Sequence, residues 1–152
     1  CPGQVVIAGA TEAVQKACDV MKEVGAKRAI LLPVSAPFHS TLMQPAADRL
    51  KEVLDSIEVA DAKIPVYANV TAKPETRGEE IRDVLVKQAA SPVQWETSVR
   101  NMIADGVDTF IEVGPGRVLT GFVKKIDRSF TGQNVEDLAS LEKILAYLKE
   151  VR

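Results

Sequence analysis

Apolar residues recur along the chain with two different spacings, and each spacing predicts one kind of element. Short continuous apolar runs occupy residues 4–8, 29–34, 64–70 and 109–113, and runs of this length are typical of buried strands. Elsewhere, apolar residues at intervals of three and four predict amphipathic helices. These predicted helices cover residues 11–25, 42–57, 81–88, 95–106, 118–126 and 138–148. Alternating strands and helices favour an α/β protein with a largely parallel sheet, whose sites form at the carboxyl ends of strands.

Local signals set the ends of several helices and single out one polar residue. Thr11 is placed to cap the first helix and Gly25 to end it. Pro45 favours a start of the second helix near that residue, because proline is tolerated only in the first turn. Gln88 continues the apolar stripe of the helix over 81–88, and a polar residue at such a position needs a partner.

Composition and charge exclude several classes of protein. The chain has 152 residues, 46% of them apolar, which suits one modest core. Its 19 basic and 21 acidic residues leave a net charge of −2, and basic residues are not clustered with aromatic ones, so a nucleic-acid partner is not expected. No apolar run reaches the ~20 residues that span a membrane, and no signal-peptide pattern is present. We therefore expect a protein of the cytoplasm, or of an organelle matrix, without a membrane partner.

The two cysteines, Cys1 and Cys18, have no partners at metal-ligand spacing, so neither a metal site nor a disulfide framework is expected. Cys18 lies on the apolar stripe of the first helix, where cysteine behaves as a small hydrophobic residue. Cys1 could act as an amino-terminal nucleophile that uses its own amine as base. The alternative interpretation is a chain cut within a fold, because an apolar strand candidate follows Cys1 almost at once.

The only histidine, His39, is the leading candidate for proton transfer, because its ordinary pKa lies near neutrality. It follows the predicted strand over 29–34 and precedes a helix, a position where histidine can also serve as a cap or a surface residue. A base needs a nucleophile, yet the sequence contains no G-x-S-x-G elbow.

The segment Gly114-Pro115-Gly116 joins a predicted strand to a predicted helix. Its free amides could hold an anion, or it could be a tight turn that packs the helix against the strand. Glu112, inside the apolar strand just before it, could face a polar partner or cap a neighbouring loop.

Five motifs in order carry a resemblance to a known family. They are Pro2-Gly3-Gln4-Val5-Val6-Ile7-Ala8-Gly9, Pro33-Val34-Ser35-Ala36-Pro37-Phe38-His39-Ser40, Leu42-Met43, Pro92-Val93-Gln94-Trp95, and Glu112-Val113-Gly114-Pro115-Gly116 with Val118-Leu119. Together they resemble the malonyl-CoA:acyl carrier protein transacylases of fatty-acid synthesis. The resemblance covers essentially the whole chain, which corresponds to about the carboxyl-terminal half of the family's sequence.

The resemblance implies a chemistry for His39. In the family, a serine on a G-H-S-x-G elbow takes the malonyl group from malonyl-CoA and passes it to the phosphopantetheine thiol of acyl carrier protein. His39 matches the histidine that activates this serine, and Gln88 matches the residue whose main-chain carbonyl orients the histidine. Phe38 resembles the phenylalanine of malonyl-selective domains, where methylmalonyl-selective ones tend to carry serine. The serine, the arginine that pairs with the malonyl carboxylate and an oxyanion-hole glutamine would all precede Cys1, so the isolated chain should be inactive.

The resemblance also implies an architecture and a set of partners. Residues 1–37 would end a small ferredoxin-like subdomain with a βαβ portion, and residues 38–152 would form the carboxyl-terminal part of a larger hydrolase-like domain. Partners would be acyl carrier protein, malonyl-CoA and the missing amino-terminal half, with possible self-association of this chain through exposed strand edges and apolar surface. A coenzyme A thioester would be substrate, with no bound cofactor. The alternative function is a non-catalytic module that binds acyl carrier protein.

Overall fold

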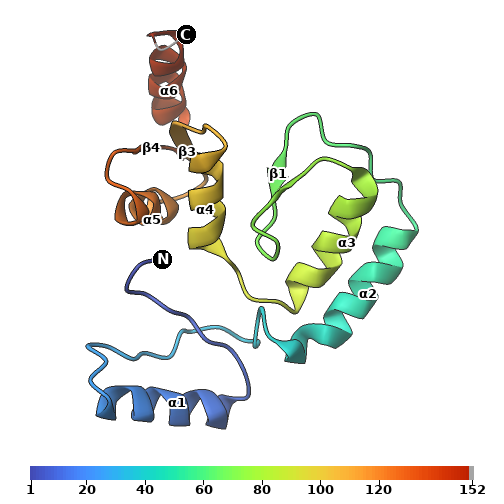
Figure 1. Ribbon diagram of the computed structural model, residues 1–152, viewed down its shortest axis with the longest axis vertical. Helices are drawn as coiled ribbons and strands as arrows, with labels where there is room; N and C mark the ends of the chain where they lie inside the picture. The colour runs from blue at the N-terminus through green and yellow to red at the C-terminus, as the bar shows by residue number, and fades with distance from the viewer. Residues whose placement is uncertain (151–152) are drawn as a thin grey trace. The chain divides into compact units, whose positions relative to one another are not determined.

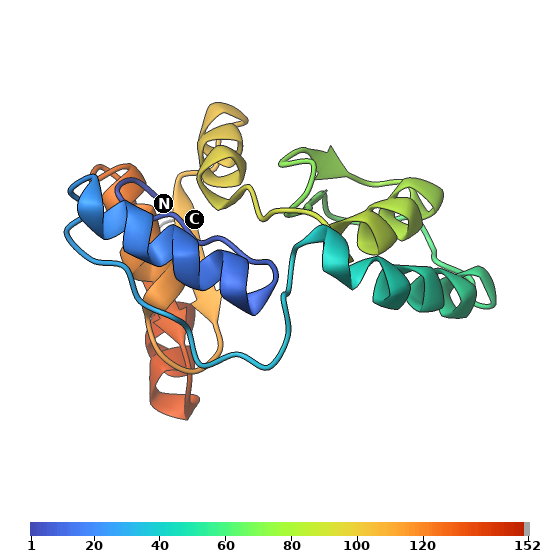
Figure 2. The same ribbon diagram turned by 90° about the horizontal axis from the view of Figure 1, so that it is seen from below.

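The computed structural model describes residues 1–150 of the chain, apart from the side chain of Thr131. Its residues form two compact units, each with its own internal contacts. The central unit is Val5–Gln94, and the carboxyl-terminal unit consists of Cys1–Gln4 and Trp95–Arg152. Both carry helices and short strands, so the predicted α/β class is confirmed at this level (Figures 1 and 2).

Helix α1, Thr11–Glu23, begins the central unit. It starts at Thr11 itself after Ala10, whose side chain makes no capping bond, so the predicted Thr11 cap is wrong. Gly25 ends the segment as predicted: it has a left-handed φ of 92° and donates its N–H to the carbonyl of Lys22. The helix has no buried residue among those described.

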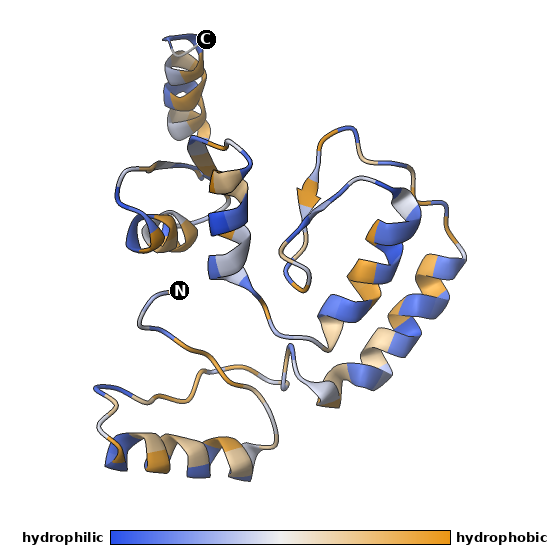
Figure 3. Cartoon of the chain, viewed as in Figure 1, coloured by the Kyte–Doolittle hydropathy of each residue, from blue (hydrophilic) through white to orange (hydrophobic). Residues whose placement is uncertain are grey.

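The two apolar segments that flank α1 do not form the predicted strands. Residues 4–8 and 29–34 are not strands, although Figure 3 shows how hydrophobic they are. A strand is held by hydrogen bonds to a neighbouring strand, and neither segment is paired within the described part of the chain. Their apolar side chains lie largely exposed, with Val5 88% accessible. The strand–helix–strand prediction for residues 1–34 is therefore wrong for its two strands.

Two helices and a small hairpin make up the rest of the central unit. A short 3₁₀ helix, η1 (Thr41–Met43), leads into α2 (Gln44–Asp55), and Pro45 occupies its first turn as predicted. Helix α3, Gly78–Ala89, lies alongside α2 (Figures 1 and 2). Of the strand predicted over 64–70, only β1 (Val66–Tyr67) forms, and it pairs antiparallel with β2 (Pro74–Glu75). Buried apolar residues of this unit are Ala47, Leu54, Ala72 and Val84.

The carboxyl-terminal unit contains a parallel pair of strands among helices. Its elements, in order, are α4 (Trp95–Ala104), β3 (Thr109–Val113), α5 (Val118–Ile126), β4 (Thr131–Val135) and α6 (Leu138–Glu150). Strands β3 and β4 run parallel, with Thr109 opposite Thr131 and Val113 opposite Val135. The core joins Val99 of α4 to Val123 and Ile126 of α5, with Phe110 and Phe130 packed edge to face beside them.

Across the described residues, we find no helix with the length and apolar character that crossing a membrane requires.

Candidate active site

His39 lies in a tight turn between an extended segment and η1. Its backbone φ is 59°, a left-handed value that L-residues other than glycine rarely adopt. Among the described residues, Ala72 is the one other non-glycine residue with a positive φ. Such backbone conformations persist only where the surrounding structure holds them, and they occur often at functional sites. The imidazole is exposed and belongs entirely to the central unit.

The ring of His39 contacts the last turn of α3. Its Nδ1 lies 3.1 Å from the main-chain oxygen of Gln88, a residue 49 positions further along the chain. The last carbonyls of a helix lack the N–H four residues on that would bind them inside the helix. The Gln88 oxygen accepts a long bond from the N–H of Ser91 at 3.4 Å, and its second lone pair can also accept the imidazole N–H. The carboxyl end of a helix also carries a partial negative charge, which favours a nearby cation. Helix α3 therefore offers His39 both an acceptor and a favourable field.

The contact fixes which nitrogen of the neutral imidazole carries the proton. A carbonyl oxygen can only accept, so Nδ1 must be the donor in this bond. The proton of the neutral ring then sits on Nδ1, and Nε2 keeps a free lone pair. A histidine held in this way can accept a proton at Nε2.

The side chain of Gln88 has a different environment from its carbonyl. It is half-buried and lines a largely apolar pocket between α3 and the β1–β2 hairpin, together with Tyr67, Ile81 and Leu85. The apolar stripe singled out Gln88 by its side chain, whereas the contact with His39 uses its main chain, which the stripe does not indicate.

Phe38 and Ser40 flank the histidine. The Phe38 side chain is 49% exposed, so it can meet a ligand beside His39. Ser40 is half-buried, and its hydroxyl donates to the carbonyl of Pro37 over 2.7 Å. The sequence shows that a serine follows His39, but it does not show that this hydroxyl bonds to Pro37, because the bond depends on the folded shape of the turn.

The Gly114-Pro115-Gly116 segment is a tight turn whose amides are already used. The Glu112 carboxylate accepts the N–H groups of Leu119 and Thr120 and the Thr120 hydroxyl, at 2.8 to 3.1 Å. The Glu136 carboxylate accepts the N–H of Gly116 at 2.9 Å. Two internal carboxylates thus occupy the positions that an anion would need, and Glu112 faces a polar partner, Thr120 at the start of α5, which is the first of its two predicted interpretations.

These bonds change the acidity of Glu112. The backbone N–H of Thr120 has the largest effect and holds the pKa of the Glu112 carboxyl below its ordinary value. Burial, the second-largest effect, raises the pKa, and the Thr120 hydroxyl and the Leu119 and Val118 amides lower it further. The carboxylate is therefore the favoured form beside the helix start.

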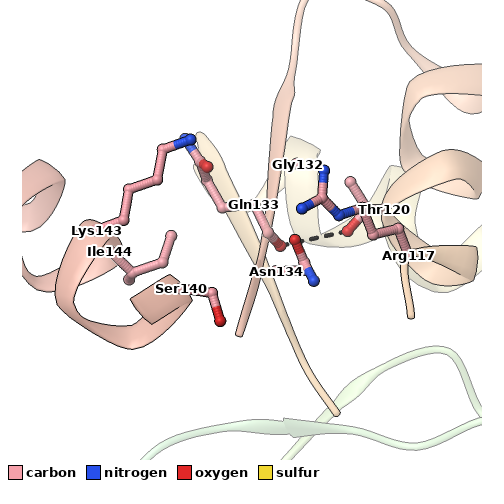
Figure 4. Close-up of a pocket in the computed structure, with 8 residues that line it drawn as sticks. All are labelled: Arg117, Thr120, Gly132, Gln133, Asn134, Ser140, Lys143 and Ile144. Carbon is pink, nitrogen blue, oxygen red and sulfur yellow. Dashed lines mark hydrogen bonds between the residues drawn. The ribbon is translucent and has the colours of Figure 1, made fainter. Parts of the chain in front are cut away.

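A small pocket in the carboxyl-terminal unit lies apart from this chemistry. Figure 4 shows residues of α6 on one side of it and Arg117 and Thr120 on the other, with β4 between them. Its hydroxyl groups already have partners: the Ser140 hydroxyl donates to Asp137 and the Thr120 hydroxyl donates to Glu112, both outside the lining, and the Thr120 hydroxyl also lies 3.3 Å from the main-chain oxygen of Gln133. The charge of Arg117 also helps to lower the pKa of Asp137, after the larger effect of hydrogen bonds from Ser140. We therefore interpret this pocket as a packing gap between α5, β4 and α6, not as a ligand site.

Comparison with known proteins bears on the whole chain. A family model described as "Acyl transferase domain" matches residues 1–148. The chain belongs to this acyl transferase family. A relative named malonyl CoA-acyl carrier protein transacylase, from Bacillus subtilis, is 50% identical over 150 residues, which are 99% of this chain and 47% of the relative.

Solved structures of this acyl transferase family have the same fold. An acyl carrier protein S-malonyltransferase from Vibrio cholerae superposes with a TM-score of 0.85 at 46% identity, covering 90% of this chain and 44% of that one. A malonyl-transacylase solved in complex with its type II PKS acyl-carrier protein gives a TM-score of 0.88 at 45% identity, covering 91% and 45% of the two chains. The chain thus spans about half the length of the relatives it matches.

Proposed function

We propose that the complete protein transfers a malonyl group from malonyl-CoA to the phosphopantetheine thiol of acyl carrier protein, with His39 as general base. The observation that carries the proposal is the 3.1 Å contact between His39 Nδ1 and the main-chain oxygen of Gln88. It leaves Nε2 free to accept a proton, and a relative at 50% identity is named for this transfer. The nucleophile would be a serine in the part of the protein outside this chain.

The carbonyl of Gln88 takes the orienting role that a carboxylate plays in a Ser-His-Asp triad. It selects the tautomer and fixes the plane of the ring. A carbonyl is neutral, so it stabilises the imidazolium less than a carboxylate does. The partial charge at the end of α3 adds to this stabilisation.

The reaction proceeds in two balanced half-reactions. In the first, His39 Nε2 accepts the serine proton while the serine oxygen bonds to the thioester carbon; the carbon–sulfur bond then breaks, and the coenzyme A sulfur takes the proton from His39. In the second, Nε2 accepts the proton of the carrier thiol as its sulfur bonds to the malonyl carbon; the ester bond breaks, and the serine oxygen regains the proton. The base is restored after each half-reaction, so no cofactor is consumed.

Phe38 is proposed to set acyl selectivity. It is adjacent to His39 and half-exposed, so its ring can limit the room beside the reacting thioester. We expect Phe38→Ser to raise kcat/KM for methylmalonyl-CoA relative to malonyl-CoA by about 10-fold or more. One additional carbon in a pocket typically changes discrimination between substrates by this factor. An unchanged ratio would show that Phe38 does not set the selectivity.

The proposal includes an assembly. We propose that residues 1–37 end a small ferredoxin-like subdomain, that residues 38–152 belong to a larger hydrolase-like domain, and that the chain functions with the amino-terminal half of the same protein. The last of these has support from the solved relatives, because this chain covers less than half of their length. Acyl carrier protein is proposed as partner because one of those structures is a complex with it.

A cytoplasmic location stays a prediction. The non-catalytic alternative is not favoured, because the relatives are named as transacylases.

The test of His39 is malonyl transfer by the complete protein that contains this chain. His39→Ala should lower kcat by at least ~10²-fold, the usual contribution of a general base. Lys63→Ala, at an exposed position of the same unit, is the control and should transfer at the normal rate. Near-normal transfer by His39→Ala would overturn the proposed role.

A further inference from the structure

The turn that carries His39 has a strained backbone, and other contacts must stabilise that conformation. At φ 59° the histidine backbone is in a region disfavoured for L-residues. The direction of the imidazole depends on that backbone, because a relaxed φ would carry the side chain away from the carbonyl of Gln88. A contact that keeps the turn closed would therefore also keep the ring in place.

Ser40 makes such a contact. Its hydroxyl donates to the carbonyl of Pro37 over 2.7 Å, and this bond spans the turn with His39 inside it. The carbonyl of Ser40 also accepts the N–H of Met43 at 3.0 Å, which ties the same residue to the start of η1. Ser40 thus joins the turn before the histidine to the helix after it.

The direction of the Ser40 hydroxyl distinguishes it from an ordinary helix cap. Ser40 is at the N-cap position of η1, where a serine oxygen usually accepts an N–H of the helix that follows. It makes no such capping bond here. The hydroxyl points backwards to Pro37 instead, so its bond acts on the histidine turn and not on the helix.

We propose that Ser40 is a positioning residue for His39: it holds the left-handed turn that directs Nδ1 to the Gln88 carbonyl and leaves Nε2 as the base. This inference rests on the proposed function for its effect on catalysis. It predicts that loss of the Ser40 hydroxyl makes the orientation of the imidazole less fixed. The proton of the neutral ring then moves in part from Nδ1 to Nε2, so a smaller fraction of molecules has the free Nε2 lone pair that acts as base.

The first experiment reads the ring directly. The complete protein is labelled with ¹⁵N-histidine, and the signal of His39 is identified by its absence in His39→Gln. Nitrogen shifts should report a proton on Nδ1 in the native protein and a shift of population toward Nε2 in Ser40→Ala. The tautomer is observed without any turnover, so this result does not depend on whether His39 is catalytic.

A matched control exists in the same unit. The hydroxyl of Ser56 donates to the carbonyl of Val53, also over 2.7 Å and three residues back, at the end of α2. Ser56→Ala removes the same kind of bond away from the histidine turn, so it should leave the His39 nitrogen shifts and the transfer rate unchanged. An identical response of Ser40→Ala and Ser56→Ala would overturn the proposal.

Kinetics supply the second readout. In malonyl transfer, Ser40→Ala should lower kcat by on the order of 10-fold, less than the loss of the base itself, with KM for malonyl-CoA unchanged. Rates are expressed per active site, by titration of the acyl-enzyme, so that unfolded protein does not count as lost kcat. If Ser40→Ala does not fold, Ser40→Thr and Ser40→Val replace it, because they have nearly the same shape and only threonine retains the hydroxyl.

The outcomes separate this inference from the proposed function. Native-like shifts and kcat in Ser40→Thr, with displaced shifts and reduced kcat in Ser40→Val, would support the positioning role. Equal behaviour of the two variants would overturn it. Normal activity of His39→Ala, in contrast, would overturn the function, while the nitrogen shifts would still decide whether Ser40 holds the ring.

Discussion

Gly78 shows how close packing can allow only glycine at a single position. It is buried at the start of α3, and its N–H donates to the Asp61 carboxylate at 2.7 Å. A Cβ at this position would collide with the main-chain oxygen of Val59. Backbone atoms cannot move aside as the end of a side chain can, so residue 78 must be glycine for α3 to begin beside this segment.

We predict that Gly78→Ala lowers the free energy of unfolding by about 1–3 kcal/mol, the usual cost of forcing a methyl group into a filled space. The measurement is a urea titration followed by circular dichroism. Gly121→Ala is the matched control: Gly121 is inside α5, and a Cβ there meets nothing within 4 Å. Alanine should stabilise that helix by about 0.4–1 kcal/mol. Destabilisation of equal size in both variants would contradict the packing argument.

The residues of the site differ in how far the sequence reveals them. His39 is identified by its chemistry, since it is the only histidine, and Gln88 is singled out as a polar residue on an apolar stripe. The contact between them depends on a main-chain oxygen, and every residue has one. The left-handed turn and the bond from Ser40 to Pro37 depend on three-dimensional closure, so sequence patterns could not predict them.

At the scale of elements, helices were predicted better than strands. The 3.6-residue period located α1 to α6 because a helix satisfies its own hydrogen bonds. β3 was predicted with its observed bounds from its apolar run. β4 was missed because its sequence, Thr-Gly-Gln-Asn-Val, has no apolar alternation. Residues 4–8 and 29–34 have strand composition but no paired neighbour within the described chain, and a strand cannot form without one.

Glu112 connects β3 to α5 through a bond that depends on pH. Its pKa is lowered in the folded state, chiefly by the N–H of Thr120, so its contribution to stability is fully present above the ordinary value of 4.5 and is lost as pH falls through the folded pKa. We predict that Glu112→Gln is less stable than the native protein at pH 7, because the neutral amide interacts more weakly with the start of the helix.

The same variant should approach native stability as the medium is made more acidic. Urea midpoints measured from pH 7 down to pH 3 would show the two curves converging below about pH 4.5. Glu142→Gln, at an exposed position on α6, is the control and should follow the native curve throughout. A constant difference between Glu112→Gln and the native protein at all pH values would mean that the charge of Glu112 does not contribute.

At the scale of the whole molecule, the exposed apolar segments that flank α1 are the dominant feature. Val5 and Val6 are 88% and 65% accessible, and Leu31 and Leu32 are 51% and 54% accessible. Contiguous apolar surface of this kind is typical of interaction sites, whereas single exposed apolar residues are ordinary. These segments also join no sheet within the described part of the chain, so a further strand could bind most of their backbone groups.

We predict that the isolated chain associates with itself through these segments, and that the amino-terminal half of the protein competes for them. Sedimentation velocity at micromolar concentration should show oligomers of the chain alone. Addition of the amino-terminal half, expressed separately, should replace them with a one-to-one complex. Because both partners would use the same surface, the two forms of association should exclude each other.

Charge placed on the segments tests where the association occurs. Val6→Lys and Leu31→Lys should shift the isolated chain toward monomer and also weaken the complex with the amino-terminal half, because burying an unpaired ammonium group is costly. Leu138→Lys, which changes a leucine that is 70% accessible on α6, is the control and should alter neither association. A monodisperse native monomer, or equal effects of all three substitutions, would show that the segments flanking α1 are not the interface.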